Sequence, residues 1–191
     1  SSEIMRLFIA REAVDHHMQT AFALVDPAAS MPERRRALRR AMRFYPGWYA
    51  ARWVASGHSY REFGRLAKHL RFAERATRRL GRALFHAMLR FGPKLERRQM
   101  VLFRAVDIGA ELFAMSAACV RAQMLASAGQ PHAVTLADVF CSSARERIAI
   151  RFRQLFGPGD PALYALAQQV LEGEHAWLEQ GIVGMMQQHP R

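Results

Sequence analysis

Hydrophobic residues recur at helical spacing along most of the chain. In the opening segment, one helix face is marked by Ile4, Leu7, Phe8, Val14, Met18 and Phe22. Residues 60–91 keep a similar apolar stripe, and a further long helix is predicted from residue 94 to about residue 128. At 1.5 Å per residue, each of these two helices would be roughly 45–50 Å long. No alternating strand pattern competes, so the sequence predicts an all-α fold.

Short breaks separate the predicted helices. Glycine and proline disfavour helix, and they mark breaks at Pro27, Tyr45-Pro46-Gly47, Gly92-Pro93, 129–131 and 157–160. Two helix starts carry capping signals, in which Ser30 pairs with Glu33 and Thr135 pairs with Asp138. A last helix is expected from Pro161. Long helices joined by such short connections predict an antiparallel helical bundle.

Length and composition set further limits. The chain has 191 residues, which is enough to bury a core of its own. The most apolar stretch, 101–120, contains Arg104, Asp107 and Glu111, and these charges argue against a transmembrane helix. Cys119 and Cys141 lie in helical, apolar surroundings. We predict that both are buried, reduced thiols, which fits a cytoplasmic protein.

Positive charge is concentrated in one part of the chain. Residues 31–100 contain 19 Arg or Lys and 4 Asp or Glu, whereas the remaining residues contain 9 basic and 12 acidic side chains. The formal net charge of +12 is therefore a local excess. Such an excess predicts an anionic partner.

The stretch ERRRALRRAMRFYPGWYAARW, residues 33–53, combines this charge with aromatic residues. We interpret it as a membrane-surface segment, because arginines attract anionic headgroups by about 1 kcal/mol each and aromatic rings suit the membrane–water interface. The residues assigned to this surface are Arg35, Arg36, Arg39, Arg40, Arg43, Phe44, Trp48, Tyr49 and Trp53.

Two other interpretations of this stretch stay open. The first is a solvated basic helix that packs through Leu38 and Met42, with its aromatic residues completing a core. The second is a nucleic-acid surface, whose phosphates attract the same charges. Clustered aromatic residues would contribute to that surface only by stacking on single strands.

Residues that could carry catalysis or bind a metal are few. Glu172 and His175 have the Glu-x-x-His spacing of di-iron bundles. The sequence contains no second such pair, so we interpret both as solvated helix residues. It also contains no Gly-rich phosphate loop, no Ser/His/Asp order and no CxxC motif. We therefore predict no catalytic residue and no metal site in this chain.

The opening residues SSEIMRLFIAR resemble the segment that follows the catalytic glutamate in flavin-dependent acyl-CoA dehydrogenases. The motif of that family runs Glu-Gly-Thr-(Asn/Ser)-Glu-Ile-x-Arg-Leu and continues to an Ala-Arg pair. The matching positions are Ser1, Ser2, Glu3, Ile4, Arg6, Leu7, Ala10 and Arg11, with Ser1 in place of threonine. The resemblance implies that the catalytic base lies two positions before Ser1, and that Ser1, Ser2 and Glu3 contact FAD.

A second resemblance is to the C-terminal helical domain of the very-long-chain subgroup. Its pattern Arg-x-(Ala/Val)-Asp-x-(Gly/Ala)-x-(Asp/Glu)-Leu-(Tyr/Phe)-Ala-Met is matched by Arg104, Asp107, Gly109, Glu111, Leu112, Phe113, Ala114 and Met115. Residues 141–148, CSSARERI, resemble a Cys-x-x-Ala-Ala-x-Arg-Ile region of the subgroup. These matches imply three parts: the last helix of the dehydrogenase core at 1–26, the basic aromatic segment at 27–59, and a C-terminal helical bundle at 60–191.

The resemblance also implies a function for the parent enzyme. It would oxidise a fatty acyl-CoA to the trans-2-enoyl-CoA, with a glutamate removing the α-proton and FAD accepting the β-hydrogen as hydride. This chain alone is expected to hold no FAD and to be inactive, because the catalytic base would precede Ser1.

In the subgroup, the helical domain is associated with dimer packing and with attachment to an energy-transducing membrane. We therefore expect a bacterial protein that is cytoplasmic and peripheral to the inner membrane. The expected partners are the dehydrogenase core, a second copy of the chain, an anionic membrane surface, and acyl-CoA bound through the core.

One alternative function comes from the same superfamily. A DNA-damage-response branch is thought to bind duplex DNA through a basic C-terminal domain, and the basic segment would then contact nucleic acid instead of lipid. The clustered aromatic residues favour the lipid interpretation.

Overall fold

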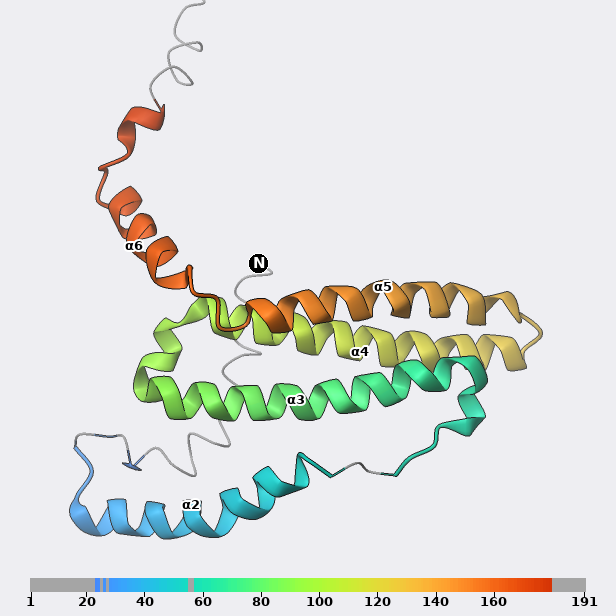
Figure 1. Ribbon diagram of the computed structural model, residues 1–191, viewed down its shortest axis with the longest axis horizontal. Coiled ribbons are helices and arrows are strands. Elements are labelled where there is room, and N and C mark those ends of the chain that lie inside the picture. The colour runs from blue at the N-terminus through green and yellow to red at the C-terminus, as the bar shows by residue number, and fades with distance from the viewer. Residues whose placement is uncertain (1–22, 25, 27, 55–56, 180–191) are drawn as a thin grey trace, which may run out of the picture. The chain divides into compact units, whose positions relative to one another are not determined.

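Helices make up the regular secondary structure of the described residues. The computed structural model describes residues 23–24, 26, 28–54 and 57–179, and Figure 1 shows how the helices are arranged. The elements are α2 (Met31–Ala51), η1 (Arg61–Leu66), α3 (Ala67–Phe91), η2 (Gly92–Arg97), α4 (Gln99–Ser127), α5 (His132–Gln154), α6 (Asp160–Leu171) and η3 (Ala176–Glu179), where η denotes a 3₁₀ helix. This described part contains no strand, which confirms the predicted all-α fold.

Three antiparallel helices form the main body of the structure. α3, α4 and α5 run side by side in alternating directions (Figure 1), and α4 packs against both of its neighbours. The 3₁₀ helix η2 joins α3 to α4, and residues 128–131 join α4 to α5. The predicted antiparallel bundle of long helices is confirmed for this part of the chain.

The chain divides into two compact units, 1–155 and 156–191. The second unit contains α6 and η3. The part assigned to the dehydrogenase core, 1–26, lies almost entirely outside the described residues. The limits at residues 26 and 59 therefore stay predictions.

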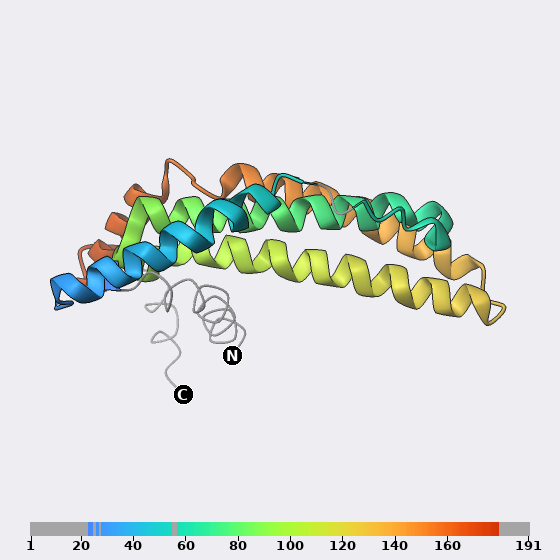
Figure 2. The same cartoon turned by 90° about the horizontal axis from the view of Figure 1, so that it is seen from below.

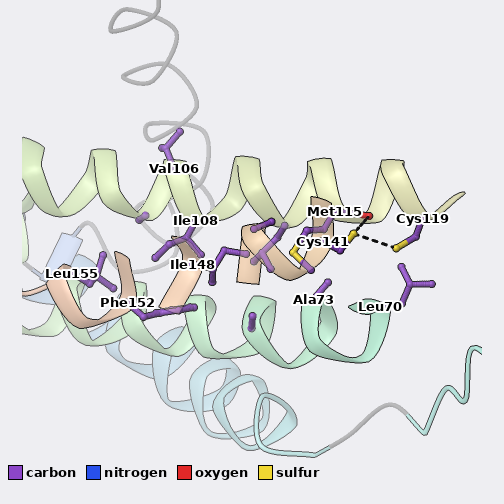
Figure 3. Close-up of a cluster of buried hydrophobic side chains, with 14 of the residues drawn as sticks. Leu70, Ala73, Val106, Ile108, Met115, Cys119, Cys141, Ile148, Phe152 and Leu155 are labelled. Atoms are coloured by element: carbon purple, nitrogen blue, oxygen red, sulfur yellow. Dashed lines mark hydrogen bonds between the residues drawn. The ribbon is translucent and has the colours of Figure 1, made fainter. Parts of the chain in front are cut away.

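The hydrophobic core lies between α3, α4 and α5 (Figure 3). Its largest fully buried apolar side chains are Leu66, Ile108, Met115, Cys119, Cys141 and Ile148. Many other core positions are alanines, including Ala73, Ala105 and Ala144. Small side chains at contact positions shorten the distance between helix axes, so the long helices can pack closely along their length.

Two cysteines meet in this core. Cys119 of α4 and Cys141 of α5 are fully buried, and their Sγ atoms face each other 3.7 Å apart (Figure 3). The Cys141 Sγ atom also lies 3.7 Å from the carbonyl oxygen of Met115. Hydrogen bonding to Cys119, together with burial, raises the pKa of the Cys141 thiol. Both cysteines are free, which confirms the prediction of buried, reduced thiols.

Pro46 does not end its helix, contrary to the prediction. α2 continues through Pro46 to Ala51, although a proline inside a helix removes one backbone hydrogen bond. The rings of Tyr45, Trp48 and Tyr49 flank the proline and lie 5.0, 5.8 and 5.4 Å from the ring of Phe85 on α3. We attribute the continuity of α2 to this tertiary packing, which the local sequence does not reveal.

The start of α3 also differs from the prediction. Instead of an α-helix from Tyr60, the chain forms η1 and enters α3 at Ala67. Within η1, Gly64 has φ 49° and ψ −118°, a conformation that glycine adopts because it lacks a Cβ atom. The glycine therefore separates the two helical segments.

Of the two predicted capping signals, one is confirmed and one is wrong. The Glu33 carboxylate accepts hydrogen bonds from the Ser30 backbone N–H at 2.8 Å and from the Ser30 hydroxyl at 2.7 Å, and these bonds lower the pKa of Glu33. α5, however, begins at His132, before Thr135. Asp138 therefore lies inside the helix, where it has a different role.

Asp138 ties α5 to the start of α3. Its carboxylate accepts a hydrogen bond from His69 Nε2 at 2.8 Å and lies 2.7 Å from the Lys68 ammonium nitrogen. His69 is fully buried, and a buried polar side chain without a partner costs about 1–3 kcal/mol. The hydrogen bonds from Lys68 and His69 lower the pKa of Asp138 to about 2. The carboxylate is therefore ionised and paired at neutral pH.

Two further ion pairs join α5 to α4. Arg147 binds Glu111 through two parallel hydrogen bonds of 2.6 and 2.9 Å, the strongest geometry for this pair of groups. One turn further along, Arg151 Nε lies 3.2 Å from Asp107 Oδ2. These pairs fix the register of the two helices at the edge of the core.

We predict that Asp138→Asn lowers the free energy of unfolding by about 2 kcal/mol at pH 7, because that energy corresponds to the lowered pKa. The folded-state pKa lies below the unfolded value, so this contribution is complete above about pH 4 and is lost as the pH falls toward 2. Urea unfolding of both proteins over this pH range measures the difference. A difference that stays constant with pH would show that ionisation of Asp138 does not contribute.

Candidate functional site

α2 carries most of the residues that the sequence assigned to an anionic surface. Its arginines Arg35, Arg36, Arg39, Arg40 and Arg43 are all exposed. On a different side of the same helix, Ala37 and Ala41 are buried. The helix therefore presents a continuous arginine side to solvent.

Exposed apolar side chains border the arginine side. Met31, Leu38 and Met42 are 62%, 48% and 66% exposed. They are seven and four residues apart, so they form one row along the helix. The alternative of a solvated basic helix with aromatic residues completing a core is therefore wrong about Leu38 and Met42, because neither side chain packs in the core. Its other parts agree with the structure, since the arginines are solvated and the aromatic residues pack on Phe85. Sequence reasoning missed this exposed row, although the seven-and-four spacing could have shown it.

The aromatic residues of α2 divide into two groups. Phe44, Trp48 and Tyr49 are partly buried, and the Tyr49 hydroxyl lies 3.0 Å from His86 Nε2 on α3. Trp53, which follows the helix, is 65% exposed, and the Arg82 guanidinium lies 4.0 Å from its ring centre. Of the predicted aromatic residues, Trp53 is thus the one that the structure exposes most clearly.

Contacts beyond the rings also hold the C-terminal half of α2 on α3. The Arg82 guanidinium donates a hydrogen bond to the carbonyl oxygen of Arg52. The Arg52 guanidinium in turn lies 4.7 Å from the centre of the Trp48 ring. In Figure 2, the C-terminal half of α2 overlaps α3, and the ring contacts at Phe85 join the two helices there. Because the half of α2 near Pro46 is fixed, the direction in which its arginines point is fixed too.

The described residues provide no metal site. No group of three or more His, Cys, Asp or Glu side chains among them could hold an ion. Glu172 caps the end of α6, and His175 Nε2 lies 3.2 Å from Gln169 Oε1. The structure does not describe Ser1, Ser2 and Glu3, so their contact with FAD stays a prediction. Likewise, no described helix is both long and apolar enough to cross a membrane.

Comparison with known proteins identifies the family. Residues 64–175 match the family described as "ACAD9/ACADV, C-terminal domain". The chain belongs to this family. The matched range covers α3, α4, α5 and α6 but not α2, so the family match describes the bundle and leaves out the basic helix. The resemblance to a very-long-chain-type C-terminal domain is confirmed.

Curated relatives agree with this assignment. The proteins named "Probable acyl-CoA dehydrogenase FadE10" from Mycobacterium bovis and Mycobacterium tuberculosis are each 47% identical to the chain over 189 residues. The similarity covers 96% of this chain, which spans 29% of the length of each relative. No solved structure matches the chain.

We predict that Phe85→Ala releases α2 from α3. Three ring contacts meet at Phe85, and each such pair contributes about 0.5–1.5 kcal/mol. Limited trypsin digestion should then cleave after the arginines of α2 at least about tenfold faster.

Phe113→Ala provides the matched control, because Phe113 lies on α4 and is 77% exposed. Its cleavage rate should equal that of the unmodified protein. Equal rates for all three proteins would show that Phe85 does not hold α2 in place.

Proposed function

We propose that this chain is the C-terminal helical domain of a flavin-dependent acyl-CoA dehydrogenase, which oxidises fatty acyl-CoA to trans-2-enoyl-CoA in fatty-acid β-oxidation. The family match over residues 64–175 and the printed name of the FadE10 relatives support the enzyme class. FAD would supply the redox chemistry. Ser1, Ser2 and Glu3 would lie against it, and the substrate would bind in the dehydrogenase core.

The helical domain attaches the enzyme to an anionic membrane surface. The observation that carries this proposal is the exposed row of Met31, Leu38 and Met42 beside the arginine side of α2. A helix with an apolar edge and a basic face lies in the plane of the interface, with the edge at the acyl boundary and the arginines at the headgroups. The protein would thus be cytoplasmic and peripheral to the bacterial inner membrane.

The size of the expected attraction fits peripheral attachment. At about 1 kcal/mol for each arginine near an anionic surface, three of the five exposed arginines contribute about 3 kcal/mol. Partial burial of Leu38 and Met42 adds about 1–2 kcal/mol. The sum gives reversible binding that weakens as salt rises.

Trp53 supplies an aromatic ring at the same surface. It is 65% exposed, and an indole ring suits the headgroup region because it has an apolar body and a polar N–H group. Trp48 and Tyr49 act differently: they hold α2 on α3 through Phe85 and so orient the surface instead of entering the bilayer.

The domain also contributes to packing in a homodimer. Support comes from Phe113, Val120 and Met124 on α4, which are 77%, 46% and 58% exposed and are spaced as one row of the helix. Apolar rows that are exposed in a single chain are typical of protein–protein contacts. Sedimentation of the full-length protein tests this part, and a monomer at micromolar concentration would contradict it.

We predict that Leu38→Ser with Met42→Ser weakens binding to vesicles of equal parts phosphatidylglycerol and phosphatidylcholine by at least about tenfold, because the apolar edge is lost. Arg39→Gln with Arg43→Gln should weaken it by about thirtyfold at low salt and by much less at high salt. Co-sedimentation of the full-length protein with the vesicles measures both effects.

Leu136→Ser with Val139→Ser is the matched control, since both residues are exposed on α5. It should leave vesicle binding unchanged. If all three double variants bind like the unmodified protein, α2 is not the membrane surface.

The enzyme class has its own test. The full-length protein, mixed anaerobically with a fatty acyl-CoA, should lose the absorbance of oxidised flavin and release the trans-2-enoyl-CoA. The two α2 variants should do the same with dissolved substrate, because α2 carries no catalytic residue. A colourless full-length protein without this reaction would contradict the assignment.

A further inference from the structure

Positive charge continues from α2 onto α3. Arg71 and Arg75 are both exposed and lie one turn apart in the first half of α3. Arg82 lies seven residues beyond Arg75, so all three share one row of the helix. At Arg82 this row contacts the residues that directly follow α2, through the Arg52 carbonyl and the Trp53 ring. The row of arginines on α3 therefore includes Arg82, which contacts the chain at the end of α2, and the exposed Arg71 and Arg75, which lie beyond that contact.

The two residues just before η1 contact the first half of α3. Arg71 Nη1 donates a 2.9 Å hydrogen bond to the carbonyl oxygen of Ser59. The Tyr60 hydroxyl, in turn, lies 3.3 Å from Glu74 Oε2. These two contacts hold Ser59 and Tyr60 against the first half of α3, while the Arg71 side chain stays exposed.

The carboxylates near Arg71 and Arg75 pair with other residues and do not neutralise these two arginines. Glu74 forms an ion pair with Arg78 at 2.5 Å and accepts a hydrogen bond from the Tyr60 hydroxyl. The Asp138 carboxylate is paired with Lys68 and His69. Among the described residues, no carboxylate forms an ion pair with Arg71 or Arg75.

We infer that α2 and the first half of α3 form one anionic-lipid-binding surface, the α2–α3 basic surface, made by Arg35, Arg36, Arg39, Arg40, Arg43, Arg71 and Arg75. The inference rests on the proposed membrane role of α2 and extends it. If α2 alone bound the membrane, the orientation of the bundle would not be fixed. A surface that includes α2 and α3 places the long axis of the bundle along the membrane plane.

The two helices contribute unequally to this surface. Helices that pack together have axes roughly 8–10 Å apart, and the end of α2 contacts α3 at Phe85 and His86. With the α2 arginines at the membrane, we therefore expect Arg71 and Arg75 to lie about one helix layer further from it. That distance is close to the Debye length of about 8 Å at physiological salt. A basic residue at the surface raises affinity about fivefold. When two such residues lie one Debye length further from the membrane, screening reduces their effect, and together they raise the affinity about threefold.

The exposed apolar row of α2 favours lipid over nucleic acid as the occupant. Duplex DNA offers phosphates to the arginines but buries little apolar surface on a phosphate-contacting helix. A bilayer interface offers both phosphates and an acyl boundary. Of these two occupants, the bilayer is therefore the one that would cover Met31, Leu38 and Met42.

The test compares two double variants of the full-length protein that remove the same charge. Arg71→Gln with Arg75→Gln should weaken binding to vesicles of equal parts phosphatidylglycerol and phosphatidylcholine by about threefold at physiological salt. Arg121→Gln with Arg153→Gln removes two exposed arginines from α4 and α5 and should leave binding unchanged. Arg71→Lys with Arg75→Lys keeps the charge and should bind like the unmodified protein.

Each remaining outcome overturns the inference in a distinguishable way. If the α3 variant binds like its control while Arg39→Gln with Arg43→Gln binds weakly, α2 alone meets the membrane and only the extension fails. If the lysine variant loses as much affinity as the glutamine variant, the effect is structural. If the unmodified protein binds no vesicles, or binds duplex DNA more tightly and the α3 variant weakens only that, the proposed membrane role fails as well.

Discussion

The packing of α2 against Phe85 determines what the rest of the basic helix presents to its surroundings. The rings of Tyr45, Trp48 and Tyr49 all pack against this one side chain. Because a helix is rigid over its length, fixing one half fixes the rotation of the other half about the helix axis. The arginines and the row formed by Met31, Leu38 and Met42 therefore face solvent together. Without this contact, α2 would be an amphipathic helix with no defined orientation relative to the bundle.

Three acidic residues of the bundle are used in pairs within it. Ion pairs that join α5 to α4 or to α3 involve Asp107, Glu111 and Asp138. Each pair is partly shielded from solvent, so its charges contribute to packing more than to the external field. The α2 arginines are paired with none of these three carboxylates, and their field extends into solvent over about one Debye length. These acidic residues therefore do not cancel the positive charge of the α2 arginines.

Sequence periodicity was enough to predict the bundle, because the long apolar stripes and the Gly-Pro breaks are local signals. It could not predict that α2 continues through Pro46, since the rings that hold it there contact Phe85, far away in sequence. Nor could it show that Asp138 pairs with His69 instead of capping a helix, because that partner lies 69 residues away. For the site, sequence identified the arginines and Trp53 correctly as exposed. The alternative that packed Leu38 and Met42 was wrong about these two side chains, because an apolar residue on an amphipathic helix is usually buried.

Pro46 has a consequence for the candidate surface itself. Proline has no N–H group, so the carbonyl oxygen of Met42 loses the donor that a regular helix would provide at this position. A carbonyl that proline deprives of its helical donor must bind water or another donor, and Met42 as a residue is exposed to solvent. At a hydrated headgroup layer that requirement is met without cost, whereas in the hydrocarbon interior it would cost several kcal/mol. The proline thus suits a helix that lies at the interface, and it argues against deeper insertion of α2.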